Sequence, residues 1–152
     1  MPLQAGTAAP TVTARNQNGE QVTVDGTGPT VLYFYPRDQT PGCTTEARQF
    51  QRELDAYHDA GVTVYGVSTD SVADHAEFCE AEGLSFDLLA DPDGELVEAF
   101  NVEARRGAAA RTTFVLVDGE VKRVYENVQP DGHARAVLAD LLDDGVVELP
   151  DA

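Results

Sequence analysis

Residues 31 to 43 read Val31-Leu32-Tyr33-Phe34-Tyr35-Pro36-Arg37-Asp38-Gln39-Thr40-Pro41-Gly42-Cys43. Residues 31–35 are apolar, aromatic or β-branched, a pattern that is typical of a strand buried on both faces. Thr40 and Pro41 suit the N-cap and the first residue of a helix. The stretch therefore predicts a buried strand, a short loop and a helix that holds Cys43 in its first turn.

The position of Cys43 affects the chemistry of its thiol. The first turn of a helix has backbone N–H groups without intrahelical partners, and the helix dipole adds about half a positive charge there. Both effects favour the thiolate over the thiol, so we interpret residues 36–43 as a candidate thiol active site. The alternative is a buried structural cysteine, to which Pro41 and Gly42 would offer little apolar cover.

Strand and helix patterns alternate on both sides of this stretch. Asn18-Gly19 and Asp118-Gly119 favour the tight turns of two hairpins. A parallel pair of strands joined by a helix predicts an α/β sandwich with a central mixed sheet flanked by helices. The expected strands are 11–15, 21–24, 31–35, 62–68, 112–117 and 121–125, the expected helices are 41–60, 71–83, 95–100 and 131–144, and 101–110 is expected to be loop.

The predicted helices carry matching end signals and apolar faces. Gly61 and Gly83 suit the ends of two helices, and Ser71 with Asp74 forms an approximate capping box. Spacings of three or four residues define the inner faces, which comprise Ala47, Phe50, Leu54 and Tyr57 in one helix and Val137, Leu138, Leu141 and Leu142 in the last.

Length and cysteine content suggest a small intracellular protein. With 152 residues and 42% hydrophobic content, we expect one domain over residues 1–152. No apolar run approaches the ~18 residues of a membrane span, and residues 1–10 lack the pattern of a secretory signal. Two cysteines are too few for a disulfide scaffold. We therefore expect a cytoplasmic protein without a membrane partner.

The charge is strongly negative. There are 27 acidic and 10 basic residues, which gives a net charge of -17, and Lys122 is the only lysine. This balance argues against a nucleic-acid or anionic-membrane partner. The acidic residues are spread along the chain, which resembles the composition of halophilic proteins. We therefore expect folding to weaken at low salt.

Three motifs together resemble one protein family. They are Tyr33-Phe34-Tyr35-Pro36, then Thr40-Pro41-Gly42-Cys43-Thr44, and finally Arg111-Thr112-Thr113-Phe114 leading into Asp118-Gly119. Over residues 6–144 the chain resembles the peroxiredoxins, specifically the bacterioferritin-comigratory or Q-type subfamily. The resemblance implies a thioredoxin-like three-layer sandwich and thiol peroxidase activity toward hydrogen peroxide and organic hydroperoxides.

The resemblance also implies a role for each motif residue. Cys43 becomes the thiolate that attacks the peroxide and is oxidised to a sulfenic acid. Arg111 supplies a permanent positive charge and several donors. The Thr40 hydroxyl and the backbone N–H groups of Gly42 and Cys43 hold the substrate. Pro36 limits solvent on one side of the sulfur.

Simpler interpretations of single residues stay open. Thr40 could act only as an N-cap, and Arg111 could be a solvated arginine at a strand end. Glu46 either orders the arginine or is a carboxylate on the helix surface. No metal-ligand spacing is present, so we expect no metal or cofactor, and we expect isolated surface positions for His58, His75 and His133.

The second cysteine decides the catalytic subtype. Many members of the subfamily place a resolving cysteine five residues after the first, where this chain has Arg48. Cys79, 36 residues after Cys43, fits members that carry it on the next helix, which implies an intramolecular Cys43–Cys79 disulfide. The alternative is a buried cysteine without a partner in a 1-Cys peroxidase.

The predicted geometry separates the two cysteines. Cys79 lies eight residues along a helix that starts at Ser71, about 12 Å from the active end of the sheet. A disulfide needs Cα atoms within about 7 Å, so we expect its formation to require local unwinding near Cys43, around Cys79, or both.

Other functional classes fit less well. A disulfide reductase would need Cys-x-x-Cys, which is absent. A redox sensor or holdase chaperone could use the same thiol, and a metal chaperone would need both cysteines close together. The resemblance implies a thioredoxin-like reductant and a monomeric protein.

Overall fold

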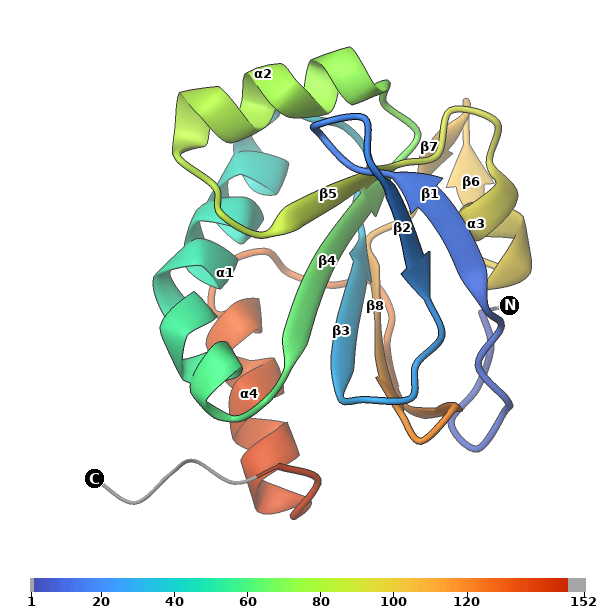
Figure 1. Ribbon diagram of the computed structural model, residues 1–152, viewed down its shortest axis with the longest axis vertical. Helices are drawn as coiled ribbons and strands as arrows, with labels where there is room; N and C mark the ends of the chain where they lie inside the picture. Colours follow the sequence, from blue (N-terminus) through green and yellow to red (C-terminus); the bar gives the residue numbers. More distant parts are fainter. Residues whose placement is uncertain (1, 148–152) are drawn as a thin grey trace.

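A mixed seven-stranded sheet forms the middle layer of the computed structural model, which describes residues 2–147 (Figure 1). The strand order is β2-β1-β5-β4-β3-β8-β9. The strands are β1 Val12–Arg15, β2 Gln21–Val24, β3 Thr30–Phe34, β4 Thr63–Ser68, β5 Asp87–Ala90, β6 Ala104–Arg105, β7 Ala108–Ala109, β8 Thr112–Val117 and β9 Glu120–Tyr125. The helices are α1 Pro41–Asp59, α2 Val72–Glu82, α3 Glu95–Ala99 and α4 His133–Asp143.

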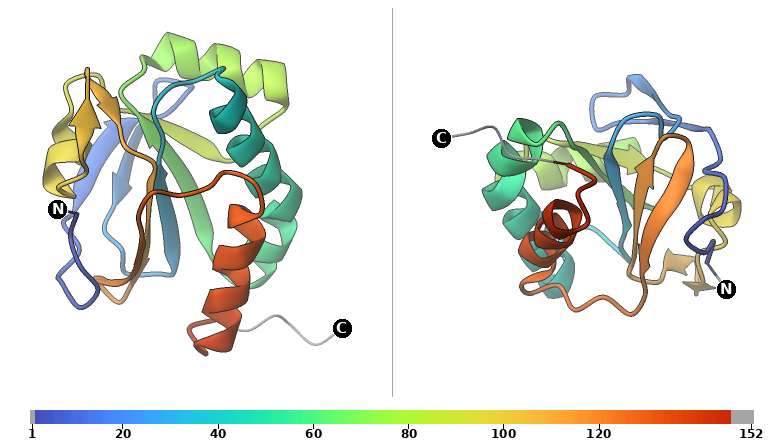
Figure 2. Two further views of the ribbon diagram at one scale, coloured as in Figure 1. Left: turned by 180° about the vertical axis from the view of Figure 1, so that it is seen from behind. Right: turned by 90° about the horizontal axis from the view of Figure 1, so that it is seen from below.

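Helices cover both faces of the sheet, as the α/β prediction requires. Figure 2 shows α1, α2 and α4 on one face and α3 on the other, and the two hydrophobic clusters of the core divide in the same way. Strand β3 contributes to both clusters: Tyr33 is in the cluster under α1, and Phe34 is in the cluster under α3. The prediction that residues 31–35 are buried on both faces is therefore confirmed, since none is more than 1% exposed.

Strand directions bring distant segments to one edge of the sheet. β3 runs parallel to β4, as predicted, and antiparallel to β8, with Phe34 opposite Thr112. The end of β3 therefore lies beside the start of β8. This pairing places the loop before α1 next to the residue that precedes β8.

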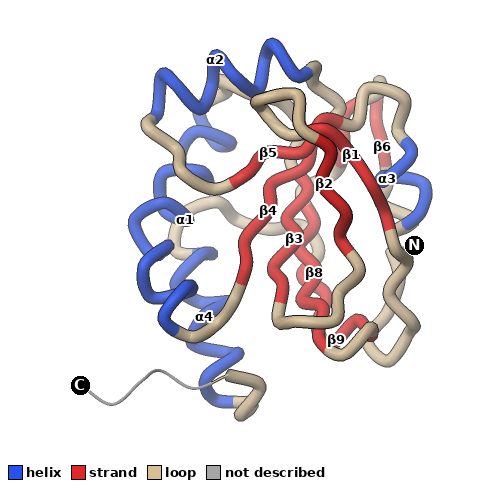
Figure 3. Tube along the Cα trace, viewed as in Figure 1, coloured by secondary structure: helices blue, strands red, loops and turns tan. Residues whose placement is uncertain are grey.

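The sequence patterns missed two features. Strand β5 pairs in parallel with β4 but was not predicted, because Leu88-Leu89-Ala90 is too short a run to show a period. Residues 101–110, expected to be loop, contain the β6–β7 hairpin (Figure 3). Its turn uses the positive φ angles of Arg106 and Gly107.

Helix ends mostly follow the sequence signals. Ser71 Oγ accepts a hydrogen bond from the Asp74 N–H at 3.1 Å, and Gly83 is left-handed with a φ of 66°. The predicted inner face of α1 is buried, and Val137 and Leu141 of α4 are fully buried. Within residues 2–147, no helix is both long enough and apolar enough to cross a membrane.

Candidate active site

Cys43 lies in the first turn of α1, at the position that the sequence predicts. Its side chain is 1% exposed and belongs to the hydrophobic cluster under α1. The expectation of little apolar cover was therefore wrong. Residues of the same cluster, such as Tyr33 on β3 and Tyr35 immediately after it, supply the cover that Pro41 and Gly42 lack.

Arg111 contacts this thiol across a long stretch of sequence. Because β8 begins beside the end of β3, Arg111 reaches the start of α1 and its Nη2 lies 3.4 Å from Cys43 Sγ. Gly42 leaves room for the guanidinium, since a Cβ at this position would lie 3.1 Å from Arg111 Nη2. The alternative of a solvated arginine at a strand end is therefore excluded.

Glu46 holds the other side of the guanidinium. Arg111 Nη1 donates to Glu46 Oε1 at 2.6 Å, and the Glu46 side chain is fully buried. Burial raises the pKa of Glu46 to about 7, although Arg111 opposes this change. Burial also opposes the charge on Arg111, but Glu46 and Cys43 raise its pKa. Glu46 is thus part of the site and not a surface carboxylate.

The buried Glu46 carboxyl predicts a pH-dependent stability. Its pKa of about 7 exceeds the ordinary value of 4.5, so the folded state binds a proton more tightly than the unfolded state between these values. The free energy of unfolding should therefore fall by about 3 kcal/mol from this group as the pH rises through that window. Urea denaturation across this range should show the fall as a loss of stability of the wild type relative to Glu46→Gln, because the other titrating groups are common to both proteins. Equal pH profiles would contradict this prediction.

Thr40 stands at the N-cap of α1, but its hydroxyl does not cap the helix. The residue is extended, and its carbonyl accepts from the Thr44 N–H at 2.8 Å. Its Oγ1 instead donates to the carbonyl oxygen of Arg37 at 3.0 Å. A hydroxyl that has already donated its hydrogen still has lone pairs that can accept one from a substrate. The predicted N-cap position is therefore confirmed, and the expected side-chain capping bond is not formed.

Pro36 is half-buried and lies two residues after the end of β3. It lines a cavity of about 260 Å³ together with Ala110, the neighbour of Arg111.

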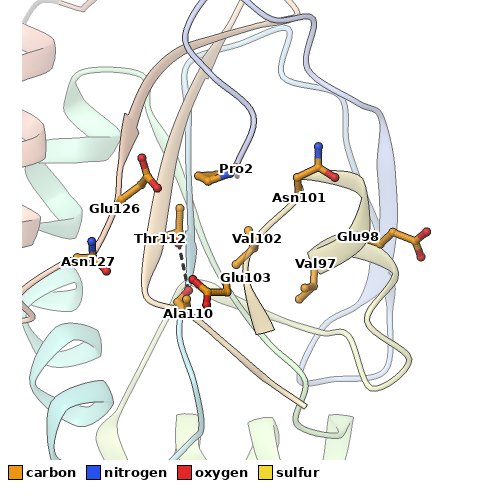
Figure 4. Close-up of a pocket in the computed structure, with 10 residues that line it drawn as sticks. All are labelled: Pro2, Val97, Glu98, Asn101, Val102, Glu103, Ala110, Thr112, Glu126 and Asn127. Atoms are coloured by element: carbon orange, nitrogen blue, oxygen red, sulfur yellow. Dashed lines mark hydrogen bonds between the residues drawn. The ribbon is translucent and has the colours of Figure 1, made fainter. Parts of the chain in front are cut away.

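A second cavity of about 670 Å³ shares Glu103, Ala110 and Asn127 with the first. Figure 4 shows this second cavity between α3, the start of β8 and the segment after β9. Its lining combines apolar Val97 and Val102 with acidic Glu98, Glu103 and Glu126.

Cys79 lies near the end of α2 and is buried. Its carbonyl oxygen accepts from the N–H groups of Gly83 and Leu84, so the residue is part of the helix end. Burial, with smaller contributions from Asp38 and Asp87, raises the pKa of the Cys79 thiol to about 12. Both cysteines are free in this structure, which therefore represents the dithiol form.

Two of the three histidines are not at the surface. His58 is exposed as expected, but His75 and His133 are buried, so that part of the prediction was wrong. His133 lies 2.9 Å from Thr113 Oγ1, and burial lowers its pKa to about 4. The available signal for His75 was its spacing of four residues from Cys79, which places both on one helix face.

His75 belongs to a group that sequence reasoning did not find. Oxygen and nitrogen atoms of Asp38, Asp70 and His75 all lie within 4.8 Å of one another. His75 Nδ1 is 2.6 Å from Asp38 Oδ2, and the Asp38 N–H donates to Asp70 Oδ2 at 2.8 Å. Hydrogen bonds among these residues account for their proximity.

The fold and this geometry define a class of protein: an α/β sandwich in which an arginine contacts a cysteine at a helix N-terminus. A family model described as the AhpC/TSA family matches residues 5–124. The chain belongs to this family.

Individual relatives are more specific. The chain is 42% identical over 119 residues to Peroxiredoxin Bcp of Xanthomonas campestris pv. campestris, covering 73% of this chain and 74% of the relative. It is 37% identical over 147 residues to Peroxiredoxin Bcp of Escherichia coli, covering 90% and 94%. These relatives identify the chain as a peroxiredoxin of the Bcp and Q type, a thiol-dependent peroxidase.

Solved structures confirm the thioredoxin-like fold of this family. Peroxidoxin BcpB from Mycobacterium tuberculosis superimposes with a TM-score of 0.86 at 31% identity, covering 93% of this chain and 97% of the other. The bacterioferritin comigratory protein of Xanthomonas campestris, described in connection with alkyl peroxide reduction, gives 0.85 at 35% identity, covering 93% and 99%.

Proposed function

We propose that Cys43 is the peroxidatic cysteine and that its substrates are hydrogen peroxide and organic hydroperoxides. The Cys43 thiolate attacks one peroxide oxygen, so an S–O bond forms while the O–O bond breaks. The sulfur is oxidised to a sulfenic acid, and the other oxygen leaves, takes up a proton and departs as water or an alcohol. The observation that carries this proposal is the contact of 3.4 Å between Arg111 Nη2 and Cys43 Sγ at the start of α1.

The neighbouring residues would then act on the peroxide. Arg111 stabilises negative charge on the sulfur and on the departing oxygen, while Glu46 fixes the guanidinium in place. Thr40 Oγ1 accepts a hydrogen bond from the peroxide, and the N–H groups of Gly42 and Cys43 donate to it. Pro36 shields the sulfur from water.

Cys79 would resolve the sulfenic acid. Its thiolate attacks Cys43 Sγ, the S–S bond forms as the S–O bond breaks, and the departing oxygen takes up a proton and leaves as water. A thioredoxin-like donor then reduces the disulfide. A second cysteine on α2, 36 residues after Cys43, supports this reading. The rivals are a 1-Cys peroxidase in which Cys79 is only structural, and a redox sensor or holdase chaperone that uses Cys43.

Oxidation products distinguish these possibilities. After a stoichiometric pulse of hydrogen peroxide, intact-mass measurement and peptide mapping should find a Cys43–Cys79 disulfide in the wild type. Cys79→Ser should accumulate sulfenic and over-oxidised Cys43, whereas Cys43→Ser should consume no peroxide. An unchanged catalytic cycle in Cys79→Ser would exclude a resolving role. A single oxidation without turnover, even with thioredoxin and its reductase present, would indicate a sensor.

The amino-acid composition supports proposals about where the protein works and what it binds. We propose that the protein is monomeric and cytoplasmic and that it binds neither nucleic acid nor membranes. We also propose that residues 1–152 form one domain, of which the structure describes residues 2–147. The net charge of -17 and exposed carboxylates such as Asp55, Glu80 and Asp144 fit work at high salt.

A further inference from the structure

A buried polar pair connects the segments that carry the two cysteines. Asp38 lies in the loop five residues before Cys43, and His75 lies on α2 four residues before Cys79. Their side chains meet in the interior, with His75 Nδ1 2.6 Å from Asp38 Oδ2. The His75 side chain is fully buried and the side chain of Asp38 is 4% exposed.

The remaining hydrogen bonds of the pair fix its proton content. His75 Nε2 lies 3.0 Å from the carbonyl oxygen of Leu89, which can only accept, so this nitrogen carries a hydrogen. Asp38 Oδ1 accepts from the Tyr35 hydroxyl at 2.5 Å. One proton is therefore shared between His75 Nδ1 and Asp38 Oδ2, either as an ion pair or as an acid beside a neutral imidazole. In both forms, removing one partner leaves the other unsatisfied in the core.

Phe78 also packs in the core, whereas the polar contacts at the C-terminal end of α2 are closer to solvent. At the C-terminal end, Arg48 pairs with Glu82, and Gln51 exchanges hydrogen bonds of 2.8 Å with the side chain and backbone of Ser85. The Arg48 side chain is 63% exposed and Ser85 is exposed, so water replaces these bonds at little cost. The Asp38–His75 pair is thus the costly connection between α2 and the loop before Cys43.

We propose that the Asp38–His75 pair is a latch that holds α2 folded until Cys43 is oxidised, and that breaking it sets the rate at which Cys79 reaches Cys43. This inference rests on the proposed function, since it concerns the resolving step. His75 and Asp38 are positioning residues here, because they act through the placement of Cys79 and contact no reacting atom.

The latch also affects the reactivity of Cys79. While α2 is folded, burial keeps the pKa of Cys79 near 12, so the thiol is protonated at pH 7. The thiolate is the attacking form, so the folded helix keeps Cys79 nearly inert. Opening the latch exposes Cys79 to water and restores the ordinary thiol. Opening the latch therefore changes both the position of Cys79 and the ionisation of its thiol in a single step.

Three variants test the latch: His75→Phe, which keeps most of the side-chain volume, Asp38→Ala, and the double variant. Tyr57→Phe is the matched control, because it removes a buried hydrogen bond of 2.5 Å between α1 and α4 and leaves α2 untouched. In the reduced proteins, amide hydrogen exchange in residues 72–82 should be about tenfold faster or more in the latch variants and unchanged in the control.

The same variants should alter the fate of oxidised Cys43. At a fixed peroxide excess, the ratio of disulfide to over-oxidised Cys43 should rise by about tenfold or more in His75→Phe, because resolution competes better with a second oxidation. The effects of His75→Phe and Asp38→Ala should not add in the double variant. An unchanged ratio, additive effects, or equal changes in Tyr57→Phe would overturn the latch.

Two readouts separate a failed latch from a failed function. Sulfenic acid formation at Cys43 in a Cys79→Ser background tests the peroxidase chemistry without the latch. Hydrogen exchange of α2 in the reduced proteins tests the latch without peroxide. If His75→Phe does not fold, Asp38→Ala and His75→Asn provide the same comparison, with Asn expected to fall between Phe and the wild type because its amide can still donate to Asp38.

Discussion

Replacing Arg111 by glutamine should lower kcat/KM for hydrogen peroxide by about 10²–10³-fold. The guanidinium is the group that contacts Cys43 Sγ, and it is held by the buried Glu46 carboxyl. Glutamine carries no charge, so the negative sulfur and the departing oxygen lose their main stabilising partner. Steady-state peroxide consumption with a thioredoxin-like donor measures the loss, and stopped-flow oxidation of Cys43 assigns it to the first step.

Two comparisons make this prediction specific. Arg111→Lys keeps the charge but cannot donate to Cys43 and Glu46 with one planar group, so its kcat/KM should lie between those of the wild type and Arg111→Gln. Arg135→Gln is the control, because Arg135 forms an exposed ion pair with Glu53 on another part of the surface. Equal rates for Arg111→Gln and the wild type would remove Arg111 from the mechanism.

Gly66→Ala should lower the free energy of unfolding by about 3 kcal/mol. Gly66 lies on β4, opposite Tyr33 of β3. A Cβ at Gly66 would lie 2.8 Å from Leu88 Cδ2 and 2.9 Å from both Cζ and the hydroxyl oxygen of Tyr33. Tyr33 cannot easily move, because its ring is stacked on Phe50 with centroids 4.5 Å apart. Urea denaturation in high salt measures the change.

The control for this substitution is another glycine. Gly28→Ala should change stability by no more than about 0.5 kcal/mol, because the added Cβ would meet no atom within 4 Å. Tyr33→Phe should recover part of the loss in Gly66→Ala, since it removes one of the close contacts. The Tyr33 hydroxyl has no hydrogen-bond partner among the described residues, so removing this hydroxyl breaks no hydrogen bond. A loss in Gly28→Ala as large as in Gly66→Ala would contradict the packing argument.

Local patterns predicted most elements because they depend on neighbouring residues. The alternation of turn signals with apolar runs gave both hairpins and the strands of the β3–α1–β4 unit. Strand β5 lacked such a signal, since its character comes from burial between β4 and β1. The two buried histidines were missed for a related reason: a polar side chain enters a core only where distant groups satisfy it, as Asp38 does for His75.

The sequence by itself determined where the Cys43 thiol stands. A strand of apolar residues, a Thr-Pro helix start and Cys43 in the first turn follow from residues within a short stretch, because capping and helix geometry are local. Only the tertiary structure decided what surrounds that thiol. Antiparallel pairing of β8 with β3 brings Arg111 to Cys43 from 68 residues away, and burial under the sheet turns Glu46 and His75 into interior partners. Such contacts depend on strand order and burial, which short-range patterns do not contain.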